Sequence, residues 1–276
     1  MSLPRVFIAG VRRGRIEIGQ AFGRPRELFS FLSTPALFVV LALFVDRDIP
    51  GSSVPMADLM VAGGVSTMVI QTALLTLPQV LATDREDGTL LRLKAVPGGI
   101  PAYLVAKTLV VAATALLGAA LTLAAGALAV GSGLPVDAAH WLTLAWVLLL
   151  GLVGLAPLGA AIGVLLPNAR QALGLAMLPI LFLMIASGLY FPVTVMPELL
   201  QNIVQVFPMK WIAQGTRSAL LPDAALSAET QGSWQHLQTL GVVGLWALVG
   251  YLLVPGLIRR TTRRQSGSRP RRSELV

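Results

Sequence analysis

Six long apolar stretches dominate this chain of 276 residues, and they constrain its fold more than any other feature. A helix that crosses the hydrocarbon core of a bilayer needs about 20 mainly apolar residues. Because 55% of the residues are hydrophobic and only 12% are charged, the composition argues against a soluble globular protein. We therefore predict an all-α membrane protein whose transmembrane domain covers 27–258. Its six transmembrane helices are expected at about 28–45, 57–82, 102–130, 141–166, 172–190 and 237–258.

The distribution of positive charge predicts how these spans are oriented. With a cytoplasmic N-terminus, the segments on the cytoplasmic side hold 18 of the 21 lysines and arginines, and the outer segments hold three. Since cytoplasmic loops carry such an excess, we expect both termini in the cytoplasm. The first apolar stretch begins only at Leu28, so we expect it to remain as a span and not to be a cleaved signal. The net charge of +8 lies mainly at the two ends, which favours contact with anionic membrane lipid over nucleic acid.

The two ends of the chain have different patterns. Within 1–26, the apolar residues Phe7, Val11, Ile18 and Phe22 share one helical face. This pattern predicts a cytoplasmic amphipathic helix that lies in the membrane interface. The segment 259–276 is rich in arginine and has no apolar periodicity, so we expect a disordered, basic cytoplasmic tail.

The segment between the fifth and sixth spans, 191–236, is too long for a simple connection and too apolar for a loop. Pro197 and Pro208 can each start a short helix. Helices of about 10 to 14 residues are too short to cross a bilayer. We predict that 191–223 forms a re-entrant helical hairpin, which dips into the membrane from the outer face. The alternative is an external domain that lies flat on the membrane.

The sequence lacks the groups that an enzyme or a metal site would need. It contains no cysteine, and the apolar stretches carry ionisable residues only near their ends, at Asp58 and Lys107. The acidic cluster at 84–87 is followed by no further acidic residue at helical spacing, so we expect neither a catalytic residue nor a metal site. No Gly-Lys pair is present, which excludes a phosphate-binding P-loop. We expect no cofactor on this chain, and any ATP must be hydrolysed by another chain.

Neutral polar residues in the second span suggest a path for a substrate. Thr72, Thr76 and Gln79 share one face of a regular helix, and neutral polar groups that face lipid are costly. The fifth span adds flexible apolar surface that suits varied ligands. The predicted path residues are Gln71, Thr72, Thr76, Met184 and Ser187. Hydrogen bonding between helices explains the same pattern equally well.

Two segments have distinctive residue patterns. The first is TDREDGTLLRLKAVPGGIPAYLVAK at 83–107, between the second and third spans. The second is 187–217, which contains Pro197, ten further residues, Pro208 and then Arg217. Both segments resemble the permease subunits of type-2 ABC exporters, and the second follows the signature of that family. Leu189 and Trp211 depart from that signature. The layout of an interfacial helix, six spans and a long segment before the last span is also similar.

The resemblance implies the permease subunit of a bacterial multidrug or antibiotic efflux transporter, multi-pass in the inner or plasma membrane. Such a subunit forms a homodimer or a heterodimer with a homologous permease, and ATP and Mg are bound by a cytoplasmic ATP-binding subunit. It would export amphiphilic molecules, such as a drug, an antibiotic or a lipid. Alternatives are an ion-gradient-driven secondary carrier, a permease for polysaccharide or lipid-linked glycan, and a membrane scaffold or sensor that transports nothing.

By the same resemblance, the segment 84–97 forms the coupling helix that docks on the ATPase. Its acidic start suits a helix N-terminus, and its leucines offer an apolar contact surface. A solvated charged loop is the alternative. The residues expected to contact the ATPase are Asp84, Arg85, Glu86, Gly88, Thr89, Leu93 and Pro97.

Overall fold

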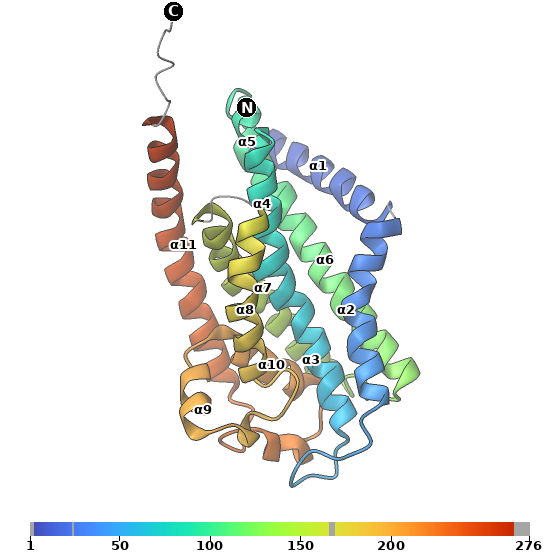
Figure 1. Cartoon of the computed structure of the whole chain (residues 1–276). Helices are drawn as coiled ribbons and strands as arrows, with labels where there is room; N and C mark the ends of the chain where they lie inside the picture. Colours follow the sequence, from blue (N-terminus) through green and yellow to red (C-terminus); the bar gives the residue numbers. More distant parts are fainter. Residues whose placement is uncertain (1–2, 24, 166–168, 268–276) are drawn as a thin grey trace, which may run out of the picture.

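The computed structural model describes residues 3–23, 25–165 and 169–267, and within these residues the fold is all-helical, as predicted. Long helices run side by side, with α1 lying obliquely across one end of the bundle (Figure 1). We call this end, which also holds α5, the α5 end; the opposite end is the α9 end. The α-helices are α1 (Leu3–Gly23), α2 (Pro25–Leu43), α3 (Met56–Gln71), α4 (Leu77–Glu86), α5 (Thr89–Lys94), α6 (Gly99–Ala129), α7 (Ala138–Leu165), α8 (Ala169–Ala186), α9 (Glu198–Val204), α10 (Pro208–Leu220) and α11 (His236–Gly267). The other helical segments are the π-helix η1 (Thr72–Thr76) and the 3-10 helices η2 (Val193–Val195) and η3 (Asp223–Ala228).

Four of the described helices are long and apolar enough to cross a membrane. They are Met56–Glu86, Gly99–Ala129, Ala138–Gly163 and His236–Leu253. The first and fifth predicted spans correspond to shorter apolar helical segments, Phe31–Leu43 and Met177–Ala186. Each of the six apolar stretches is therefore mainly helical in its described part, although 44–45 and 187–190 lie beyond the ends of α2 and α8. The count of six spans stays a prediction.

Two segment boundaries differ from the sequence prediction. The segment 84–97 is not one helix, because α4 ends at Glu86 and α5 begins only at Thr89. Gly88 between them has a φ of 70°, a left-handed conformation that ends a helix. At the other boundary, the predicted disordered tail is helical up to Gly267, because 259–266 contains neither glycine nor proline to stop α11. The remaining tail, 268–276, lies outside the described residues.

The second long span is interrupted by the π-helix η1, which lies just before Pro78. A proline in a regular α-helix lacks a backbone N–H and clashes with the carbonyl four residues earlier. Here the turn widens, and the Leu77 N–H donates to the Thr72 carbonyl, five residues back. The carbonyl of Ala73, whose partner in this wider pattern would be the absent N–H of Pro78, lies against Gly159 of α7.

Close approach to this widened turn requires glycine on α7. A Cβ on Gly159 would lie 1.9 Å from the Ala73 oxygen, and one on Gly163 would lie 2.8 Å from the Pro78 oxygen. The two glycines, spaced by four residues, therefore serve contacts inside the chain. They bring α7 against the main core cluster, where α3, η1, α7, α8, α10 and α11 meet.

The helix α7 starts at a well-defined cap. The Asp137 carboxylate accepts a hydrogen bond of 2.9 Å from the backbone N–H of His140 and one of 2.8 Å from its ring. The backbone hydrogen bond from His140 is the main cause that lowers the pKa of Asp137 below its ordinary value. This cap fixes where the chain turns back into the bundle at the α9 end.

The contact between α7 and η1 can be tested with Gly159→Ala. In an ordinary helix interior, alanine is favoured over glycine by about 0.5–1 kcal/mol. At Gly159 the clash with a backbone oxygen should reverse the sign and cost about 1–3 kcal/mol. Gly174→Ala in α8 is the matched control, because among the described residues no atom outside the local helix backbone lies within 4 Å of the position of its Cβ. The measurement is the Tm in detergent. An equal Tm for Gly159→Ala and Gly174→Ala contradicts the prediction.

Candidate functional site

A cluster of charged side chains joins α1, α4 and α6 at the α5 end. The Lys107 ammonium lies 2.9 Å from a carboxylate oxygen of Glu17 and 2.9 Å from one of Asp84. Tyr103 donates a hydrogen bond of 2.8 Å to the same Asp84 oxygen. Arg13 pairs with Glu17 at 2.7 Å and stacks its guanidinium over the Tyr103 ring. We call these five residues the α1–α6 cluster.

The cluster holds the N-terminal helix firmly because α1 also packs closely on α6. A Cβ on Gly10 would lie 2.7 Å from Val105, and one on Gly14 would lie 3.3 Å from the Ala106 carbonyl oxygen. The Lys107 side chain is only 12% exposed, so its charge needs both carboxylates. Any displacement of Asp84 therefore acts directly on α1 and on the base of α6.

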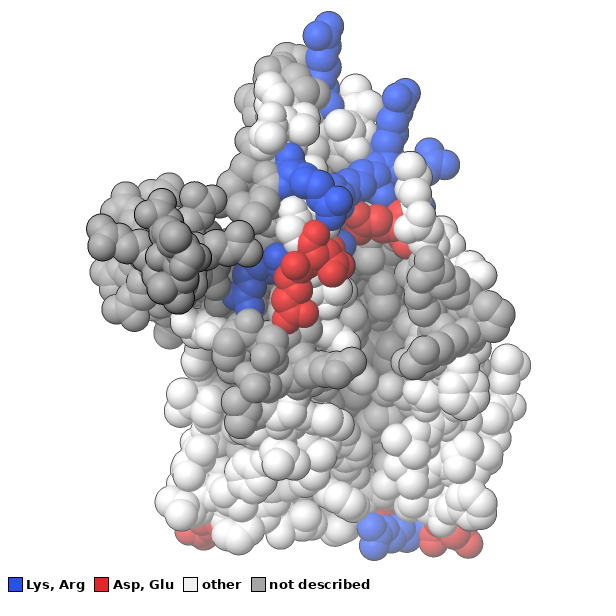
Figure 2. Space-filling view, turned by 45° about the horizontal axis from the view of Figure 1, so that its top comes forward, with Lys and Arg blue, Asp and Glu red and all other residues white. Residues whose placement is uncertain are grey.

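Among the predicted coupling residues, Asp84 belongs to the α1–α6 cluster and the others follow it in the chain. Asp84, Arg85 and Glu86 form the last turn of α4, Gly88 makes the left-handed turn, and Thr89 begins α5. Leu93 is half-buried in α5, and its carbonyl lies so close to Gly99 that a Cβ there would be 2.4 Å away. Pro97 is exposed in the turn before α6. Figure 2 shows that charged side chains gather at this end, while the described body of the bundle is almost free of charge.

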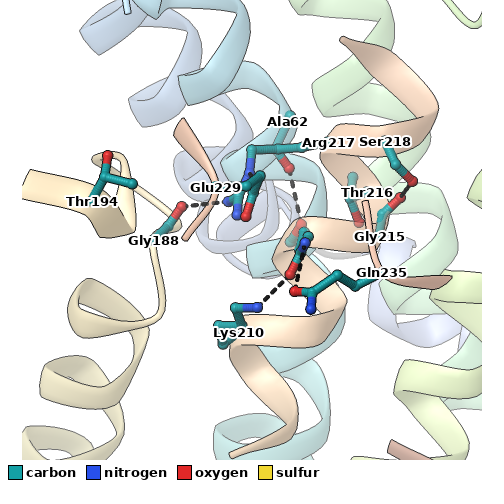
Figure 3. Close-up of polar contacts among 12 residues, drawn as sticks. Ala62, Gly188, Thr194, Lys210, Gly215, Thr216, Arg217, Ser218, Glu229 and Gln235 are labelled. Carbon is teal, nitrogen blue, oxygen red and sulfur yellow. Dashed lines mark hydrogen bonds and ion pairs between the residues drawn. The ribbon is translucent and has the colours of Figure 1, made fainter. Parts of the chain in front are cut away.

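At the α9 end, Arg217 of α10 forms a buried ion pair that joins three segments (Figure 3). Its Nε donates to a Glu229 oxygen at 2.6 Å, and its Nη1 donates to the Gly188 carbonyl at 2.6 Å. The two side chains are 2% and 0% exposed. The sequence singled out Arg217 but not Glu229, which follows η3 in an irregular segment with no pattern to mark it.

The two prolines expected in the exit segment lie at helix starts. Pro197 immediately precedes α9, and Pro208 is the first residue of α10. Apart from its half-buried last residue, α10 is buried, and it packs among α3, α7 and α11, whereas α9 exposes Leu199 and Ile203. The segment before the last long helix thus contains one enclosed helix and one surface helix.

The predicted path residues do not lie together on one surface. Thr72, Met184 and Ser187 are buried by their own chain, and Met184 belongs to the main core cluster. Gln71 is half-buried and accepts a hydrogen bond of 3.1 Å from Thr34 of α2, while Thr76 is exposed. The widened turn of η1 is the physical reason, because it rotates Thr76 and Gln79 away from the face of Thr72. Only Gln71 and Thr76 are accessible to a substrate or a neighbouring chain.

Two apolar cavities lie between α6 and α7, which follow one another in sequence. One has a volume of about 510 Å³ and reaches Trp141 towards the α9 end. The other, of about 450 Å³, reaches Lys107 towards the α5 end and is also lined by α4 and by Tyr251 of α11. None of the five predicted path residues lines either cavity. Among the described residues, no group of three or more His, Asp or Glu side chains could hold a metal ion.

Long apolar helices, with charge gathered at one end and buried ion pairing at the other, define a multi-pass membrane protein. The family model of the ABC-2 type transporter matches residues 17–221. Because this match covers most of the chain, the protein belongs to the ABC-2 type transporter family, which confirms the resemblance at the level of the family. The protein is thus a membrane permease of an ABC transporter, a transport subunit. The comparison with curated proteins returned no match.

The buried ion pair can be tested with Arg217→Met, Glu229→Leu and the double variant. Removal of one partner leaves an unpaired buried charge and should cost about 3–5 kcal/mol. The double variant removes both charges of the pair, so its Tm in detergent should lie above that of either single variant. Arg47→Met, at an exposed arginine near the same end, should leave the Tm almost unchanged. A wild-type Tm for Arg217→Met contradicts a role of the pair in stability.

Proposed function

We propose that this permease exports amphiphilic small molecules, such as a drug, an antibiotic or a lipid, from a bacterial cytoplasm. A separate cytoplasmic subunit binds ATP and Mg and hydrolyses the ATP. The permease acts as a dimer with a second copy or with a homologous permease. Family membership supports the class of transporter, and the α1–α6 cluster is the observation that supports this way of coupling.

In this proposal the α5 end faces the cytoplasm and the ATPase. The lysines and arginines favour this orientation, because ten of the 21 lie in α1, in α5 and in the last part of α11. The exposed Arg12 and Arg15 of α1 would face the phosphates of anionic lipid, since Arg13 points to Glu17.

The coupling segment is 84–97, comprising the last turn of α4, the turn at Gly88 and the short helix α5. Movement of α5 would act on two long elements at once, because α4 continues into η1 and α3, and Gly99 starts α6 against Leu93. The movement would also reach a third element, α1, because Lys107 contacts both Asp84 and Glu17. ATP drives export if it binds the two conformations of the dimer with different affinities.

The apolar cavities between α6 and α7 favour an amphiphilic substrate over a strongly polar one. Gln71 and Thr76 are the members of the predicted path that we retain, because the chain itself encloses the other three. We also propose that the segment 191–223 dips into the membrane from the outer face. The enclosed helix α10 supports this proposal, since it packs among three long helices.

The coupling role can be tested with Glu86→Arg in vesicles that contain the permease and its ATPase. We expect loss of stimulated ATP hydrolysis and of export, because the reversed charge changes the surface that meets the ATPase. Insertion of the permease should be normal. Glu198→Arg, the same charge reversal at the α9 end, should keep both activities. Full activity of Glu86→Arg argues against docking at 84–97, and export driven by an ion gradient without ATP identifies a secondary carrier.

The orientation can be tested with single cysteines, because the chain has none of its own. A membrane-impermeant maleimide should label Ser53→Cys, between α2 and α3 at the α9 end, in intact cells. It should label Asp87→Cys, at the α5 end, only after the cells are permeabilised. Both residues are exposed in the structure, so a difference in labelling reports the side of the membrane. The reverse pattern contradicts a cytoplasmic α5 end.

A further inference from the structure

A pocket of about 350 Å³ with both polar and apolar lining residues lies between α10 and α11 at the α9 end. It is distinct from the apolar cavities and from the coupling segment. Four glutamines and one tryptophan line it: Gln205, Trp211, Gln231, Gln235 and Gln238. We call it the glutamine pocket. No carboxylate is among its lining residues, so the pocket offers amide groups and an aromatic ring.

A chain of hydrogen bonds leads from a buried cation to this pocket (Figure 3). Lys210 donates to the side-chain oxygen of Gln214, and both residues are fully buried. An ammonium group can only donate, so Gln214 must turn its amide nitrogen the other way. That nitrogen donates to the Ser233 carbonyl at 2.8 Å and to the Gln235 side-chain oxygen at 3.4 Å.

The direction of donation continues to the pocket itself. Gln235 has its oxygen occupied by Gln214, and its amide nitrogen donates to the Gln231 oxygen. The exposed Gln231 must therefore present its own NH₂ group outward. Every donor in the series points away from Lys210, so the pocket ends in a donor that the buried charge polarises.

The charge of Lys210 is not balanced within the described part of the chain. Its ammonium lies 3.7 Å from the centre of the Trp211 ring, and no described carboxylate lies within ion-pair distance. Glu229, the carboxylate that acts on it electrostatically, is already paired with Arg217. The three buried charges leave a net positive charge behind the pocket, which favours an anionic occupant.

The backbone at Gln235 is held in an unusual conformation. Its φ is 50°, which residues other than glycine rarely adopt, and it is the only such residue in the described ranges. The Gln235 carbonyl accepts the Thr239 N–H at 2.9 Å in the first turn of α11. Left-handed backbone of this kind concentrates at binding sites, and here it places the one side chain that links Gln214 to Gln231.

The α11 wall of the pocket changes from polar to apolar along one helix face. Gln238, Gly241, Val242 and Leu245 line it at spacings that keep them on one side of the helix. Leu245 lies about 10 Å along the axis from Gln238, towards the middle of the span. A molecule with a polar head and an alkyl chain matches this gradient.

We propose that the glutamine pocket binds the anionic oxygen group of an amphiphile, a phosphate or a carboxylate, with its alkyl chain along Val242 and Leu245. The amide of Gln231 donates to the anion, and Lys210 supplies the charge through Gln214 and Gln235. The pocket then selects anionic amphiphiles at the outer side of the membrane. The assignment of the pocket to the outer side, and of its ligand to the transported substrate, rests on the proposed function.

Binding can be measured with the purified permease alone, by native mass spectrometry from detergent. The probes are dioctanoyl phosphatidylglycerol, dioctanoyl phosphatidylcholine and glycerol phosphate. We expect the wild type to bind phosphatidylglycerol about tenfold more tightly than phosphatidylcholine, the effect of one charge-assisted hydrogen bond. Gln231→Leu and Lys210→Met should each remove most of this preference. Asn202→Leu, at an exposed amide of α9 outside the pocket, should retain it.

Each outcome decides the proposal. Equal binding of the two lipids by the wild type, or an unchanged preference in Gln231→Leu, overturns it. If glycerol phosphate competes as well as phosphatidylglycerol, the pocket binds a free anion, and the proposal of an amphiphilic ligand is wrong. Gln231 is exposed, so this variant decides the result even if Lys210→Met does not fold. No ATPase is present, so failure here is separate from failure of the Glu86→Arg experiment.

Discussion

Hydrocarbon offers no water, so each charge and each backbone group that enters the bundle needs a partner within the protein. The two ends of the molecule solve this in the same way. Lys107 lies between Glu17 and Asp84 at the α5 end, and Arg217 binds Glu229 and the Gly188 carbonyl at the α9 end. Each solution joins segments that are distant in sequence. The placement of α1, and of the irregular chain around α10, follows from these contacts.

The apolar stretches were predictable from the sequence because length and hydropathy are local properties. Within the described ranges the structure confirms an all-helical fold, and four helices there are long enough to span. Helix boundaries that depend on single turns were harder to predict from the sequence. Gly88 breaks the segment 84–97, and α11 continues to Gly267 although its last part has no apolar face. A glycine can end a helix or lie within one, and only its φ distinguishes the two cases.

The candidate sites were predicted in part. Arg217 was identified through the resemblance to the family signature, but its partner Glu229 could not be, because the pair depends on how the chain folds after α10. Lys107 is a lone cation at the end of an apolar stretch, and Glu17 is the lone acid of the arginine-rich first segment. These two signals could have suggested their contact. In the Lys210 series, the spacing of four residues between Lys210 and Gln214 could have suggested their contact on one helix. The bond from Gln214 to Gln235 carries no such signal, because the left-handed backbone at Gln235 places that side chain.

The widened turn before Pro78 divides one long span into two halves with unrelated angular phase. The α3 half is enclosed by neighbouring helices of the same chain, whereas the end of η1 and α4 bear the exposed Thr76 and Gln79. Residues that would share one face of a continuous helix therefore point in different directions before and after η1. The first half is a buried helix that is held in place within the bundle. The second half has a surface that another molecule can contact, and it leads directly to Asp84.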